Sequence, residues 1–61
     1  MNEDVKIVIT SKSGRTYLAS GWSIVDFEYR IRNVNVSILV KDERGNYVRL
    51  MPSAIESFEE V

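Results

Sequence analysis

The sequence SIVDFEYRIRNVNVSILVK, residues 23–41, decides the fold, because apolar and polar side chains alternate along most of it. In the first half, the alternating apolar residues are Val25, Phe27, Tyr29 and Ile31. After a break at Arg32 and Asn33, they are Val34, Val36, Ile38 and Val40. Successive side chains of a strand point to opposite faces of a sheet, so the pattern predicts two strands, each with one apolar face. We place these strands at residues 24–31 and 34–41.

A helix over residues 24–31 is the main alternative to the first of these strands. Ser23 would cap such a helix, and the apolar residues Ile24, Val25, Phe27 and Ile31 have roughly helical spacing. We favour the strand because the alternation is unbroken over seven residues. β-branched and aromatic residues, which are typical of strands, also dominate the segment.

Shorter segments on either side of residues 23–41 predict three further strands. We place them at residues 5–9, 15–20 and 47–51. The first two form a hairpin around Gly14, and the third follows a charged turn that contains Gly45, since glycine supplies the positive φ of such turns. Pro52 ends the last strand, because proline has no N–H to donate to a sheet.

The tail SAIESFEEV, residues 53–61, fits two structures. Ser53 and Glu56 have the spacing of a helical capping box, and the apolar residues of that helix would be Ala54, Ile55, Phe58 and Val61. Alternatively, a 3₁₀ turn at residues 53–55 leads into a short closing strand. In that second form the tail resembles the end of small SH3-like and Sm-like barrels.

The expected architecture is mainly β: a single domain over residues 1–61, with an antiparallel sheet curled into an SH3-like barrel and a short C-terminal helical turn near residues 53–56. The predicted core consists of Val5, Ile7, Ile9, Leu18, Val25 or Phe27, Val36, Ile38, Val48, Leu50, Ile55 and Phe58. A chain this short buries only about 60% of its unfolded surface. Its small core and exposed sheet edges therefore predict a homodimer.

The composition excludes several classes of function. The chain has no cysteine and no histidine, so we expect no disulfide, no metal site, no cofactor and no catalytic residue. Eight basic and nine acidic side chains give a net charge of −1, which does not favour strong binding to duplex nucleic acid. There is no apolar run of about 18 residues and no secretory signal. We therefore expect a cytoplasmic protein with no membrane partner.

Two sets of side chains are candidates for binding. The set expected to contact a protein partner is Trp22, Asp26, Phe27 and Glu28. On a strand, Asp26 and Glu28 would share one face about 7 Å apart. No nucleophile or glycine-rich loop accompanies them, so we interpret them as solvated carboxylates. The alternative set, a basic and aromatic face for single-stranded nucleic acid, is Tyr29, Arg30, Arg32, Tyr47 and Arg49.

The N-terminal half carries a family resemblance. The residues concerned are Asp4-Val5, Gly14, Tyr17, Gly21, Ser23 and Asp26-Phe27-Glu28. With nearly this spacing, the chain resembles the small phage-encoded inhibitors of uracil-DNA glycosylase, in which the motif lies on a helix. The resemblance implies a dimer that presents carboxylates and an exposed aromatic to the DNA-binding groove of the enzyme. Phe27 would be that aromatic, and Glu28 would mimic a phosphate.

The expected function is therefore that of a non-catalytic phage or mobile-element protein that binds another protein. Its expected target is a host DNA-repair or defence enzyme. The alternative is a small SH3-like or Sm-like module that binds single-stranded RNA or DNA through arginine and tyrosine side chains.

Overall fold

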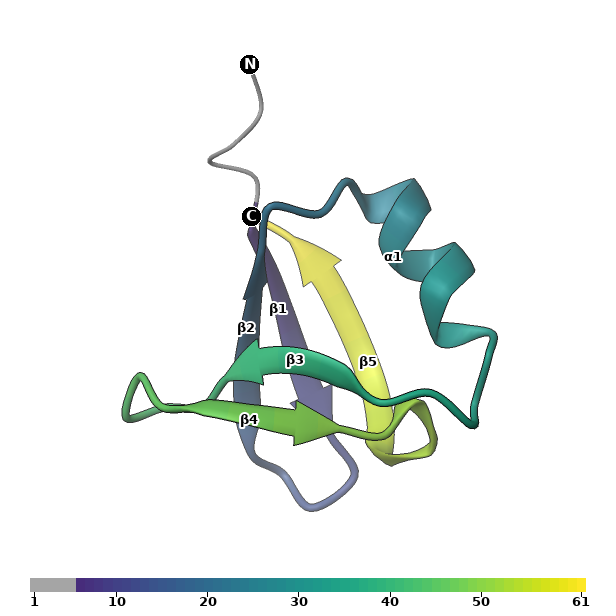
Figure 1. Cartoon of the computed structure of the whole chain (residues 1–61). Coiled ribbons are helices and arrows are strands. Elements are labelled where there is room, and N and C mark those ends of the chain that lie inside the picture. The colour runs from purple at the N-terminus through teal and green to yellow at the C-terminus, as the bar shows by residue number, and fades with distance from the viewer. Residues whose placement is uncertain (1–5) are drawn as a thin grey trace.

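The computed structural model describes residues 6–61 of the chain as one antiparallel sheet and one short helix. The five strands lie in the order β4-β3-β2-β1-β5, and the helix connects β2 to β3 (Figure 1). The elements are β1 (Lys6–Ser11), β2 (Thr16–Ser20), α1 (Ile24–Ile31), β3 (Ile38–Lys41), β4 (Tyr47–Leu50), the 3₁₀ turn η1 (Pro52–Ala54) and β5 (Ile55–Glu60). The prediction of a mainly β domain with an antiparallel sheet is confirmed.

The sheet bends sharply but does not close into the expected barrel. β4 and β5 lie at opposite ends of the strand order, and β3 and β4 run across β2 and β1 in the view of Figure 1. The bend is sharp because β3 pairs with β2 at a single position, Leu18 opposite Lys41. By contrast, β1 pairs with β2 over five positions. The sheet therefore divides into a three-stranded part and a two-stranded part that separate beyond this contact.

The predicted strand at residues 24–31 is wrong, because the segment forms α1. The Ser23 hydroxyl accepts a hydrogen bond from the Asp26 backbone N–H at 3.1 Å, and this caps the first turn. Asp26 in the first turn and Arg30 in the last also have the signs that the helix dipole favours. Val25 and Tyr29, which the alternation placed on the buried face, are 69% and 77% exposed.

The next predicted strand, residues 34–41, is shorter than expected. β3 begins only at Ile38, and the preceding residues form a loop in which the Val36 backbone N–H donates to the Asn33 carbonyl at 3.2 Å. Because α1 ends beside the sheet rather than within it, the chain needs this loop to return. Val34 and Val36 are consequently exposed, at 54% and 36%.

Both predicted hairpin turns are present, and they share one hydrogen-bond pattern. The N–H of Gly14 donates to the Ser11 carbonyl at 2.9 Å, and the N–H of Gly45 donates to the Asp42 carbonyl at 3.0 Å. Both glycines have positive φ, +92° and +85°. The Asp42 carboxylate also accepts from the backbone N–H of Asn46 at 2.9 Å, which fixes the second turn further.

The tail adopts the second of its two expected structures. A 3₁₀ turn leads into a closing strand, and the turn begins one residue earlier than expected, at Pro52. The fixed φ of proline suits the first position of a helical turn. β5 then pairs with β1 and sets Phe58 opposite Ile9.

The core lies between the inner face of the bent sheet and α1. Its buried apolar residues are Ile7, Ile9, Ala19, Phe27, Ile38, Val40 and Leu50. The ring of Phe27 lies edge-on to those of Trp22 and Phe58, with centroid distances of 6.1 and 5.0 Å. Trp22, Val48, Ile55 and Phe58 pack against this core, half-buried.

Four members of the predicted core need correction or comment. Phe27, and not Val25, fills the core from residues 24–31, and Val36 is exposed. Leu18 is half-buried on the outer face of the sheet, because it lies opposite Val8 rather than a core residue. Val5 lies outside the described residues.

Candidate binding groove

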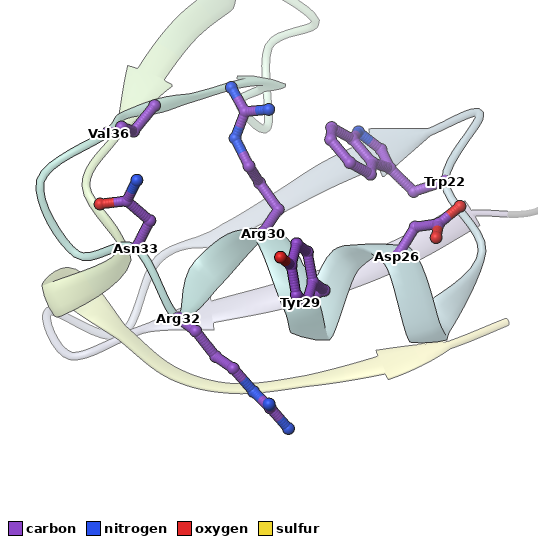
Figure 2. Close-up of a pocket in the computed structure, with 7 residues that line it drawn as sticks. All are labelled: Trp22, Asp26, Tyr29, Arg30, Arg32, Asn33 and Val36. Atoms are coloured by element: carbon purple, nitrogen blue, oxygen red, sulfur yellow. The ribbon is translucent and has the colours of Figure 1, made fainter.

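The separation of β2 from β3 creates an open groove along the surface. The groove has two adjoining hollows that share Trp22 and Arg30. The larger, about 790 Å³, is lined by Trp22, Asp26, Tyr29, Arg30, Arg32, Asn33 and Val36 (Figure 2). The second follows β3 and is lined by Leu18, Ser20, Trp22, Arg30, Ser37, Ile38, Leu39, Val40, Lys41, Tyr47 and Arg49. We call both hollows together the groove.

Local structure determines which side chains reach the groove. Trp22 and Arg30 project to the same side of α1, with Tyr29 beside them on the helix (Figure 2). Arg32 lines the end of the larger hollow, but its guanidinium extends to the opposite side of the helix (Figure 2). Arg30 is therefore the arginine of α1 whose charge lies over the groove.

The β3–β4 hairpin supplies the rest of the positive charge. Its register places Lys41 opposite Tyr47 and Leu39 opposite Arg49. The Lys41 ammonium lies over the Tyr47 ring at 5.2 Å from the centroid, a cation–π contact. Arg30, Lys41 and Arg49 thus bring three cations to the groove.

The structure separates the residues that were expected to bind a protein partner. Trp22 and Asp26 line the groove, whereas Glu28 is exposed outside it. On a helix with 3.6 residues per turn, Asp26 and Glu28 point in different directions, so they do not share a face as a strand would require. Phe27 has no exposed surface.

The burial of Phe27 also bears on the family resemblance. A helix is present where the resemblance places one, at residues 24–31. However, the role of exposed aromatic that the resemblance assigns to Phe27 is contradicted, because that ring is fully buried against Trp22 and Phe58.

The structure brings the alternative set together. Tyr29, Arg30, Arg32, Tyr47 and Arg49 all line the groove. Sequence reasoning missed Lys41 and Leu39, although both gave a signal. In the β3–β4 hairpin Lys41 lies opposite Tyr47, which belongs to the alternative set. Leu39 is the one apolar residue that interrupts the polar row of residues 34–41. Leu39 is 50% exposed at the groove.

Residues 6–61 contain no cluster of three or more acidic, histidine or cysteine side chains able to hold a metal ion. Within the same range, no helix has the length and apolar character needed to cross a membrane. No family model matches the chain, and neither a curated protein nor a solved structure matches it. The function must therefore be inferred from the groove itself.

Proposed function

We propose that this domain binds a single strand of nucleic acid along the groove. The observation that carries the proposal is the convergence of three cations, Arg30, Lys41 and Arg49, with three aromatic side chains in a chain that is acidic overall. The aromatic side chains are Trp22, Tyr29 and Tyr47. Cations that follow a phosphate backbone, with rings on which bases stack, are what single-strand recognition requires.

The local charge of the groove matters more here than the net charge of −1. Asp26 is the only carboxylate that lines the described groove. At 0.1 M salt, charges farther than about 10 Å are largely screened. A strand in the groove therefore interacts mainly with the charges that line it, which are three cations and one carboxylate.

The exposure of the rings favours a single strand over a duplex. Tyr29 and Tyr47 are 77% and 67% exposed, so each ring has surface open to a partner, although Lys41 lies over one face of Tyr47. Base stacking on such a ring contributes about 1–3 kcal/mol per base and requires bases that are not already stacked in a helix. Trp22 is held edge-on against Phe27, which fixes the ring that joins the two hollows.

The proposal has three further parts. Binding without catalysis is supported by the lack of histidine and cysteine. An SH3-like relationship is supported by the succession of β4, a 3₁₀ turn containing Pro52, and β5. A reducing cytoplasm is the compartment that suits a chain without cysteine.

Fluorescence anisotropy with labelled 15-nucleotide single strands of DNA and RNA tests this proposal. We expect binding that weakens steeply between 50 and 200 mM salt, because cations that contact phosphates release counterions. Arg30→Gln should weaken binding about five- to tenfold and lower the salt slope by about one. Tyr47→Ala should weaken binding at least about fivefold through the loss of stacking, whereas Tyr47→Phe keeps the ring and should bind nearly normally.

Arg44→Gln is the matched control, since it removes the same charge from an exposed residue of the β3–β4 turn outside the groove. Equal effects of the two substitutions would contradict a specific groove. The proposal fails if neither strand binds at 50 mM salt. It also fails if the domain instead captures a protein from nuclease-treated lysate and this capture is lost in Asp26→Asn and Glu28→Gln variants.

A further inference from the structure

The two ends of the described sheet are free edges. β4 pairs only with β3, and β5 pairs only with β1, among residues 6–61. An edge strand presents unpaired backbone N–H and C=O groups that can pair with another strand. On β5 the residues that flank Phe58 are exposed, namely Ser57 and Glu59.

These two edges carry opposite charge. β5 contains the glutamates Glu56, Glu59 and Glu60 and no cation, whereas β4 contains Arg49 and no carboxylate. Two β5 edges placed together would bring like charges side by side, which disfavours that pairing. A β4 edge beside a β5 edge would instead place arginine near glutamate.

The side chains of the two edges also match face by face. The register runs across the outer face from Glu59 to Val8, Leu18, Lys41 and Tyr47, so these residues share one side of the sheet. Arg49 lies two residues from Tyr47 on that same side. On the inner side, β4 presents Val48 and Leu50, and β5 presents Phe58 together with Glu60, which lies opposite Ile7. Joining β4 to β5 would therefore set Arg49 near Glu59 outside and Val48 and Leu50 near Phe58 inside, with the exposed Glu60 at the end of β5.

We propose that the chain associates with a second copy by adding the β4 edge of one copy to the β5 edge of the other. The sheet then continues from copy to copy. Because the two joined surfaces differ, a pair of copies still has one free β4 edge and one free β5 edge. Further copies can therefore add at these edges unless a ring closes. This head-to-tail association differs from the homodimer that we expect from the sequence.

Sedimentation velocity between 10 µM and 1 mM protein, without nucleic acid, tests this interface separately from the binding function. We expect association that increases with concentration and weakens at high salt. Arg49→Glu and Glu59→Arg should each weaken association about tenfold, because each replaces attraction by repulsion at the contact. The double variant, Arg49→Glu with Glu59→Arg, should recover it.

Mixing the two single variants gives a second test. In the mixture each reversed edge meets an edge of opposite charge on the other variant, so association should be restored to nearly the wild-type strength although each variant alone associates about tenfold more weakly. A protein that stays monomeric at 1 mM would overturn the proposal. A wild-type dimer that Arg49→Glu leaves intact would also overturn it, because the interface would then not include β4.

Discussion

Replacing Phe27 by alanine is the most direct test of how this small core is built. Phe27 is the only fully buried residue of α1 and packs between Trp22 and Phe58. Removing its ring detaches the helix from the sheet and leaves a cavity where the two meet. The substitution therefore perturbs both the core and the position of the groove residues on α1.

The expected loss is large relative to the stability of the domain. Burying a phenylalanine in a core is worth about 3–5 kcal/mol when measured by truncation to alanine. A domain of this length has a free energy of unfolding of about 3–9 kcal/mol, at about 0.05–0.15 kcal/mol per residue. Phe27→Ala should consequently remove about half of the stability or more, and the variant unfolds in water only if the loss reaches the whole free energy of unfolding. Phe27→Leu keeps much of the volume and should cost only about 1–2 kcal/mol.

Urea unfolding followed by Trp22 fluorescence and by far-ultraviolet circular dichroism measures these losses. With a slope of about 1 kcal/mol per molar urea, Phe27→Leu should lower the midpoint by about 1–2 M. Val25→Ala is the matched control, because Val25 is 69% exposed and its truncation should cost no more than about 0.5 kcal/mol. If residues 24–31 were a strand, Val25 and Phe27 would share a face. Equal losses for the two alanine variants would therefore refute the helical packing.

Three further substitutions test the fold at other points. Ile38→Ala should cost about 2–5 kcal/mol, because Ile38 is 2% exposed, and an unchanged melting temperature would exclude it from the core. Ser23→Ala removes the cap of α1 and should lower the unfolding free energy by about 1 kcal/mol in urea titration, whereas Ser23→Asp should retain most of it. Gly45→Ala should cost about 1–2 kcal/mol because φ there is +85°, and a smaller loss in Gly45→Asn would identify the backbone conformation as the cause.

The candidate groove was partly predictable from residue types. Tyrosine and arginine at positions 29, 30, 47 and 49 indicated a basic and aromatic face, and these residues do line one groove. Their neighbourhood was predicted from residue types, with residues 24–31 taken as a strand. It arises instead because α1 lies beside the point at which β2 and β3 separate. No local pattern encodes that separation, since it depends on how the two parts of the sheet pack around the core.

The sequence by itself determined the two hairpins, and with them β1, β2 and β4 to within two residues at each end. Each turn is specified within five residues, by a glycine that accepts positive φ and by a Ser11 or Asp42 side chain that bonds the backbone. Residues 24–31 are different, because their apolar side chains fit both a period of two and a period of 3.6. Only the tertiary structure decided between them, because the free energy gained by burying Phe27 against Phe58, far along the chain, is available to the helix and outweighs the strand propensity of the segment.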